Sequence, residues 1–79
     1  MIYTKEELKN LKLKLEEQNA ISLFNRIKRV NSFINNNWSK YLEAETLIKQ
    51  GTTEWKYSTS LSDITFFIKS QEHFKNLIE

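Results

Sequence analysis

A mostly helical, small α+β domain is the fold class that this sequence predicts. Apolar residues recur at intervals of three and four along most of the first 50 positions, which is the spacing of amphipathic helices. The single glycine, Gly51, interrupts this pattern, and a short alternating segment follows it. A second run with helical spacing then fills positions 61–77. The expected order is two or three N-terminal amphipathic helices, a short β-hairpin or strand around Gly51, and a C-terminal amphipathic helix.

The first helix is expected from about Lys5 to Gln18. Thr4-Lys-Glu-Glu7 has the capping-box pattern, in which the threonine caps the helix and the glutamate reaches back to it. Three leucines then recur at helical spacing: Leu8, Leu11 and Leu15. Asn19-Ala20 either ends this helix or only distorts it locally.

Helical spacing resumes after Asn19-Ala20 and continues almost to Gly51. The apolar positions are Ile21, Phe24, Ile27, Val30, Ile34, Trp38, Tyr41, Leu42 and Ile48. Asn35-Asn36-Asn37 interrupts the segment, and asparagine favours caps and turns because its side chain competes for backbone groups. We expect a break there, with Asn36 or Asn37 capping a helix from Trp38 to about Lys49. One continuous helix is the alternative, since the apolar positions stay in phase across the asparagines.

Gly51 should end that helix, because glycine adopts the left-handed conformation of a helix C-terminus without steric cost. Thr53, Trp55 and Tyr57 then alternate with polar residues, a pattern that predicts a short strand. A strand needs a partner for its backbone groups. That partner is either Glu45–Lys49, in a hairpin across Gly51, or a strand from another copy of the chain.

The last helix is expected from Leu61 to Leu77. Ser60-Leu-Ser-Asp63 is a second capping-box pattern at its start. Apolar residues follow at helical spacing: Leu61, Ile64, Phe67, Ile68, Phe74 and Leu77. We expect residues 1–79 to form one small domain, with residues 1–35 as an N-terminal helical extension and 38–79 as a helix–hairpin–helix unit.

The composition argues against several kinds of functional site. A chain of 79 residues buries only about 60–65% of its unfolded surface, so docking onto a partner is expected to stabilise it. There is no cysteine and one histidine, His73, so we expect no disulfide, no metal site and no cofactor. Neighbouring Ser70 and Glu72 do not make His73 a catalytic triad, and one glycine cannot build a phosphate loop. We predict no catalytic residue and no enzyme activity.

Charge and hydropathy limit the kinds of partner that are expected. Lysine and arginine number 12 against 10 acidic residues, so no strongly charged partner is required. No apolar run reaches 18 residues, so we expect no transmembrane helix and no membrane partner. The start of the chain is too polar for a secretory signal, which predicts a protein that is intracellular when made.

Two groups of residues are candidates for binding. The chain has two tryptophans, three tyrosines and five phenylalanines, more than one small core can hold, so some should lie at an interface. The interface candidates are Phe33, Trp38, Trp55, Tyr57 and Phe66. The second group is a basic patch, Arg26, Lys28 and Arg29, which could make a weak nucleic-acid contact or face an acidic neighbouring subunit.

The segment Thr59-Ser60-Leu61-Ser62-Asp63-Ile64, with Gly51 twelve positions before Asp63, resembles the phage head–tail joining family of lambda protein W (gpW). Residues 38–51 also look like the first helix and turn of short members, so the resemblance covers residues 38–79. It implies a β-hairpin near 46–58. It also implies a non-enzymatic head-completion subunit in the host cytoplasm and the virion, packed with other copies beneath the portal.

Two other functions remain open from the sequence. A small phage-encoded inhibitor that binds a host or defence protein would share the small size, the missing catalytic groups and the aromatic surface. A helical nucleic-acid-binding or regulatory protein is the third hypothesis, although residues 20–49 supply only part of a helix-turn-helix. For the head–tail connector and for the inhibitor, the expected partners are other proteins. These are copies of the chain and portal or tail proteins for the connector, and a host target for the inhibitor.

Overall fold

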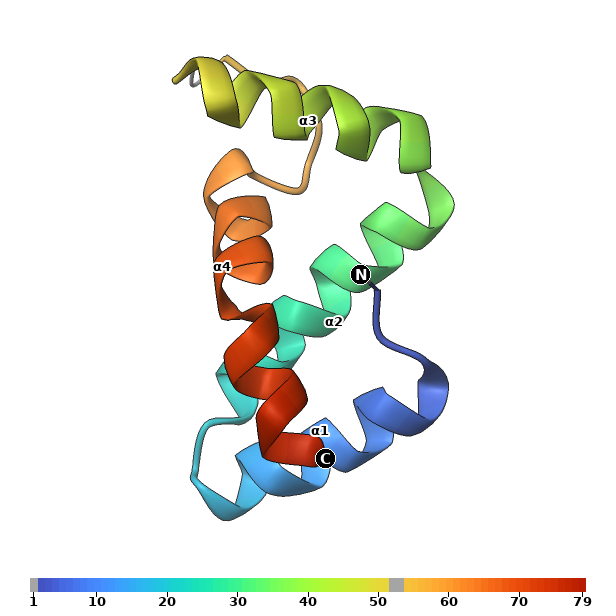
Figure 1. Ribbon diagram of the computed structural model, residues 1–79, viewed down its shortest axis with the longest axis vertical. Coiled ribbons are helices and arrows are strands. Elements are labelled where there is room, and N and C mark those ends of the chain that lie inside the picture. Colours follow the sequence, from blue (N-terminus) through green and yellow to red (C-terminus); the bar gives the residue numbers. More distant parts are fainter. Residues whose placement is uncertain (1, 52–53) are drawn as a thin grey trace.

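The computed structural model describes residues 2–51 and 54–79. They form a compact all-α domain of four helices: α1 (Lys5–Glu17), α2 (Ile21–Asn36), α3 (Trp38–Gln50) and α4 (Leu61–Ile78). α2 and α4 cross in the middle of the molecule, α1 packs against both at one end, and α3 packs against both at the other (Figure 1). The molecule extends 36 × 20 × 20 Å, so α1 and α3 lie at opposite ends of its long axis.

One hydrophobic core joins all four helices and the N-terminal segment. Its buried side chains are Tyr3, Leu11, Leu15, Phe24, Ile27, Val30, Ile34, Tyr41, Ala44, Ile64, Phe67 and Phe74. Most occupy positions that the helical spacing predicts. No helix in the described ranges has the length and apolar character needed to cross a bilayer.

The start and end of α1 follow the local sequence. Thr4 Oγ1 accepts from the Glu7 N–H at 3.1 Å, and the Thr4 N–H donates to Glu7 Oε1 at 2.9 Å, which confirms the predicted capping box. After α1, Asn19 adopts a left-handed conformation with φ of 56°. The Ala20 N–H donates to Leu15 O at 2.7 Å and the Asn19 N–H to Glu16 O at 3.0 Å. These two bonds form a Schellman motif, so the helix ends at Asn19 and is not merely distorted there.

The predicted break at the asparagines is confirmed, and the continuous-helix alternative is wrong. Asn37 lies between α2 and α3 with φ of −140° and ψ of 54°. Asn37 is the N-cap residue of α3, as predicted, but its side chain makes no hydrogen bond to that helix. Its Nδ2 instead donates to Phe33 O at 3.2 Å and satisfies a carbonyl in the last turn of α2.

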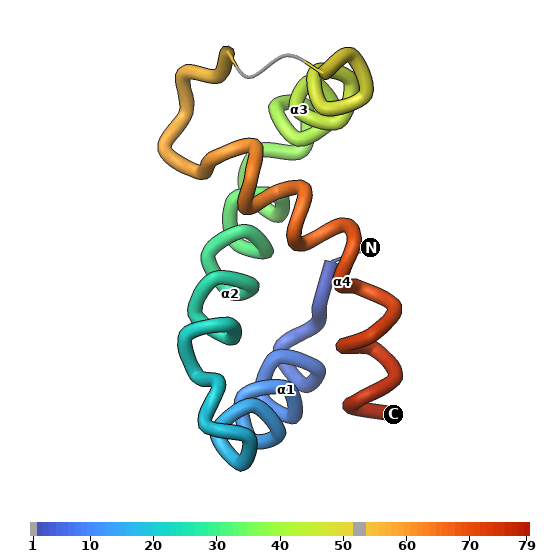
Figure 2. The backbone as a smooth tube through the Cα atoms, turned by 90° about the vertical axis from the view of Figure 1, so that its left-hand side faces the viewer, coloured from blue at the N-terminus to red at the C-terminus, as the bar shows by residue number. Residues whose placement is uncertain are grey.

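The predicted hairpin is not present, whereas the helix stop at Gly51 is confirmed. Gly51 has φ of 75° and its N–H donates to Ile48 O at 3.1 Å. Residues 45–50 belong to α3, so their backbone groups bond within the helix and cannot pair with a strand. Residues 54–60 are irregular, and the described part of the chain contains no strand; Thr53 lies outside it. Figure 2 shows α3 end-on and the 54–60 segment arching beside it before α4 begins.

α4 begins with the predicted cap. Ser60 Oγ accepts from the Asp63 N–H at 3.1 Å, and the helix continues to Ile78, one residue beyond the predicted end. The second half of the capping box is replaced by a tertiary contact, because the Asp63 carboxylate binds Arg26 and Arg29 of α2. This ion pair links the N-terminus of α4 to α2.

A candidate protein-binding surface at the α3 end

α3 is only half covered by the rest of the molecule. Tyr41 and Ala44 on its inner side are fully buried. Trp38 and Leu42, which we call the α3 surface, are 51% and 45% exposed. They are four residues apart and therefore neighbours on one side of the helix. The sequence placed both in a continuous apolar stripe, and the change of direction at Asn37 turns them outward.

Tyr41 anchors α3 to the core. Its hydroxyl donates to Glu45 Oε2 at 3.1 Å, one turn along the helix. Burial, with a smaller contribution from Glu45, raises the pKa of Tyr41 to about 12. The Trp38 ring leans on the Tyr41 ring, with centroids 5.2 Å apart. The exposed Trp38 ring is therefore supported by a buried side chain of the same helix.

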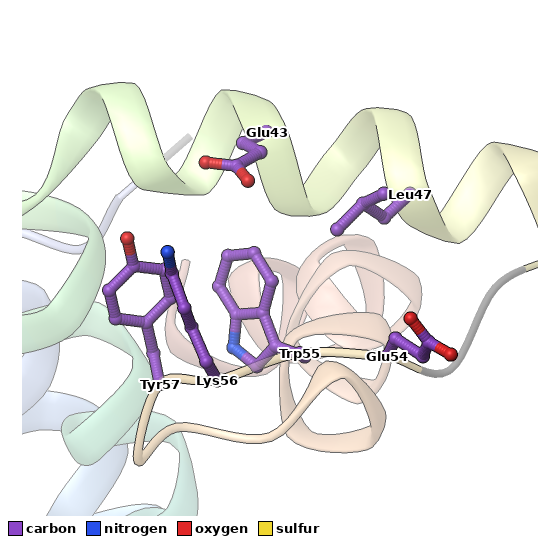
Figure 3. A pocket seen from close by; sticks show the side chains of 6 residues that line it. All are labelled: Glu43, Leu47, Glu54, Trp55, Lys56 and Tyr57. Atoms are coloured by element: carbon purple, nitrogen blue, oxygen red, sulfur yellow. The ribbon is translucent and has the colours of Figure 1, made fainter.

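The other side of α3 forms an open pocket with the 54–57 segment, which we call the α3 pocket. Its volume is about 540 Å³, and its lining residues are Glu43, Leu47, Glu54, Trp55, Lys56 and Tyr57. Figure 3 shows Glu43 and Leu47 on the helix, with the Trp55 ring rising toward them from the segment below. In the same view Lys56 lies alongside Tyr57, at the opposite end of the row from Glu54. The pocket thus combines an aromatic wall with charged groups of both signs.

Three of the predicted interface residues come together beside this pocket. Trp55 and Tyr57 have ring centroids 4.8 Å apart, and each lies 6.5 Å from Phe33 of α2. The Trp55 Nε1–H donates to Thr59 O at 2.8 Å, which holds the segment in a closed turn. All three side chains are half-buried. Trp55 and Tyr57 line the pocket, and Phe33 packs against both of them from α2.

Phe66, the remaining interface candidate, lies elsewhere. It packs against Phe74 on α4 with centroids 6.3 Å apart. The Arg26 guanidinium lies 4.2 Å above its ring centroid. Its apolar surface is therefore partly covered from within the molecule, and it is not part of the α3 surface.

One carboxylate, that of Asp63, pairs with two of the three cations of the basic patch. Asp63 binds the Nε of Arg26 and, at 3.3 Å, Nη2 of Arg29, while Lys28 is exposed. Burial alone would raise the pKa of Asp63, but the hydrogen bonds and charges of Arg26 and Arg29 outweigh it and hold the pKa below its ordinary value. An arginine already paired with a carboxylate has less to gain from a phosphate. The patch is a structural link between α2 and α4.

Sequence reasoning missed a polar contact in the core. The Tyr3 backbone is bound by the side chain of Asn31, which is buried between apolar residues of α2. Asn31 lies four residues after Ile27 and three before Ile34, on the apolar side of the helix. A polar residue at such a position signals a hydrogen bond, although the sequence does not show with which group.

His73, the one histidine of the chain, lies near the C-terminal end of α4. It is exposed on α4, and its ring lies 5.1 Å from the ring of Phe74. Within residues 2–51 and 54–79, no group of three or more histidine, cysteine or acidic side chains is placed to hold a metal ion.

Comparison of the chain with protein-family models, curated proteins and solved structures finds no match. A four-helix fold by itself does not specify an activity. The function therefore has to be argued from the α3 surface and the α3 pocket.

Proposed function

We propose that this chain is a non-enzymatic structural subunit that binds other proteins through its α3 end. One observation carries the proposal: α3 leaves two sides uncovered, the α3 surface on one and the α3 pocket on the other. Tryptophan and tyrosine are enriched in protein interfaces because they present large, rigid contact areas. Trp38 and Trp55 offer that kind of area on either side of one helix.

Within this class, we propose the role of a phage head–tail connector subunit. The resemblance to the gpW-like family rests on the Gly51 stop and on the Ser60 cap, and both features form. The hairpin of that family does not form in residues 54–60, where an irregular segment closed by Trp55 joins α3 to α4. The proposed contact is therefore made by α3 and this segment instead of a strand edge.

Native mass spectrometry of the chain with the portal complex of the same phage tests this role. The expected result is a defined number of copies on the portal. The variant Leu47→Glu, which places a charge in the α3 pocket, should lose the complex because a carboxylate would face the partner's buried surface. Lys69→Glu, an exposed position on α4, is the control and should bind like the wild type. A wild-type chain that ignores the portal would rule the connector role out.

An inhibitor of a host or defence protein is the second candidate function. It is favoured by the α3 pocket being a hollow of about 540 Å³, which can receive a protruding side chain of a target. Capture of one host protein by the wild type and not by Leu47→Glu, together with no binding to the portal, would select this function.

A further inference from the structure

The α3 pocket brings an acidic side chain of α3 close to an indole ring. Glu43 is exposed, lies one turn before Leu47 and makes no ion pair within residues 2–51 and 54–79. Figure 3 shows the Trp55 ring rising from the opposite segment toward the side of α3 that carries Glu43. Glu54 lines the same pocket from that segment. Carboxylates and indole rings are both groups that attract a cation.

The Trp55 ring carries no cation, although other rings of this protein do. The Arg26 guanidinium lies 4.2 Å from the ring centroid of Phe66, and Lys75 Nζ lies 4.6 Å from that of Tyr3. Among the lysines and arginines that the structure describes, none lies over Trp55. Tryptophan is the aromatic residue that attracts cations most strongly. A cation from outside the molecule would therefore find an available ring there.

The positive charges near the pocket are held at its Tyr57 end. Lys40 Nζ and Lys56 Nζ lie 4.6 and 5.7 Å from the Tyr57 ring centroid. Neither ammonium group is within ion-pair distance of Glu43. The pocket thus has a basic end at Tyr57, whereas the part between Glu43 and Trp55 has a negative charge and an open ring.

We propose that the α3 pocket receives an arginine side chain of the protein partner. This inference rests on the proposed function, because it requires a partner that docks on α3. A guanidinium group can stack on the Trp55 indole and donate hydrogen bonds to the Glu43 carboxylate at the same time. The methylene stem of the arginine would then lie against Leu47. A glutamate at position 47 would put a charge against that stem, so Leu47→Glu is still expected to lose the partner.

Other occupants fit the charges of the pocket less well. An apolar side chain would cover the Glu43 carboxylate without pairing it, and an uncompensated buried charge is costly. An acidic side chain would face both Glu43 and Glu54, and like charges across an interface repel. A lysine ammonium is more strongly hydrated than a guanidinium and cannot stack as a plane on the indole. Arginine is also among the residues enriched at the energetic centres of protein interfaces.

A blocked arginine, N-acetyl-arginine methylamide, tests the proposal without a partner protein. N-acetyl-citrulline methylamide, which has nearly the same shape but no charge, is the matched control probe. NMR follows the indole N–H of Trp55 and the methyl groups of Leu47. The indole N–H of Trp38, on the other side of α3, is the internal control.

The arginine probe should shift the Trp55 and Leu47 signals until they saturate, and the Trp38 signal should not move. The dissociation constant should lie in the millimolar range, because one side chain makes few contacts. The citrulline probe should bind more weakly. Glu43→Gln should weaken binding of the arginine probe about fivefold, the size expected for an exposed ion pair. Glu72→Gln, at an exposed position on α4, should bind like the wild type.

Four outcomes would overturn the proposal. These are equal binding of the arginine and citrulline probes, no saturable shift at Trp55, a shift of the same size at Trp38, and unchanged affinity in Glu43→Gln. Because no portal is present, the result is separate from the test of the connector role. A chain that binds the portal but not the arginine probe would keep the proposed function and lose this inference. A chain that binds the probe but not the portal would keep the pocket as an arginine site and lose the connector role.

Discussion

Asn31 binds the backbone of Tyr3 in both directions. The Tyr3 N–H donates to Asn31 Oδ1 at 2.7 Å, and Asn31 Nδ2 donates to Tyr3 O at 3.2 Å. The asparagine side chain thereby replaces the neighbouring strand that an extended segment would otherwise need. It places the Tyr3 ring in the core, where it meets Phe67 edge-on with centroids 5.6 Å apart. The segment before α1 is thus part of the folded domain.

Replacing Asn31 by alanine should destabilise the protein strongly. The substitution leaves the Tyr3 N–H and C=O buried without partners, and we expect a loss of about 2 kcal/mol in the free energy of unfolding. Urea unfolding measures it. Asn35→Ala, at an exposed position on the same helix, is the control and should stay within about 0.5 kcal/mol of the wild type. Equal effects of the two substitutions would contradict the role given to Asn31.

The helices were largely predictable because their signals are local. Capping residues and the three-and-four spacing depend on neighbours within one turn, so the starts of α1 and α4 and the break before Trp38 follow from the sequence. The predicted strand does not form in residues 54–60. Alternation of Trp55 and Tyr57 with polar residues also fits an irregular segment whose rings pack against Phe33, more than 20 positions away, and that contact has no local signal.

For the candidate binding residues, too, the local features were predictable and the contacts with distant residues were not. Which residues are aromatic or basic is evident from the sequence, but whether they are covered depends on distant partners. Asp63 binds Arg26 and Arg29 from 37 and 34 positions away. Trp38 is exposed because α3 changes direction at Asn37, although its apolar spacing stays in phase with α2.

Two substitutions at Asn19 should have different effects on stability. A left-handed conformation costs about 1 kcal/mol for most residues and nothing for glycine. Because Asn19 has φ of 56°, Asn19→Ala should lower the midpoint of thermal unfolding, and Asn19→Gly should leave it unchanged or raise it. Differential scanning calorimetry measures both. If alanine were tolerated better than glycine, the Schellman motif would not be what ends α1.

Acid should weaken the protein through Asp63 and Glu7. The hydrogen bond from Lys75 to Glu7 at 2.8 Å lowers the pKa of that carboxyl, and the arginines lower the pKa of Asp63. Because both pKa values are lower in the folded state, the unfolded chain binds more protons in acid. The contribution to stability is full above the ordinary carboxyl pKa values and is lost as pH falls through the folded ones. Urea unfolding between neutral and acidic pH should show this decline.

The double variant Asp63→Asn/Glu7→Gln isolates this effect. It should be less stable than the wild type at neutral pH and should lose less stability on acidification. Glu72→Gln, an exposed position on α4, is the control and should keep the wild-type pH dependence. A double variant with an unchanged slope would assign the acid sensitivity to other carboxylates.

The wall of the α3 pocket should loosen when the Trp55 hydrogen bond is removed. Trp55→Phe keeps an aromatic ring beside Phe33 but removes the bond from Nε1 to Thr59 O, worth about 1 kcal/mol. Backbone amides of residues 54–60 should then exchange with deuterium faster, while those of α1 keep their rates. Unchanged exchange in 54–60 would show that ring packing alone holds this segment.

The central claim is that other subunits dock on the α3 end, and hydroxyl-radical footprinting of side chains tests it most directly. Oxidation is compared between the protein alone and the protein mixed with the portal. The account predicts reduced oxidation of Trp38, Leu42 and Leu47 on portal binding, with residues near Lys28 and His73 unaffected. Protection centred on Phe66 and His73, with Trp38 as reactive as in the protein alone, would contradict it.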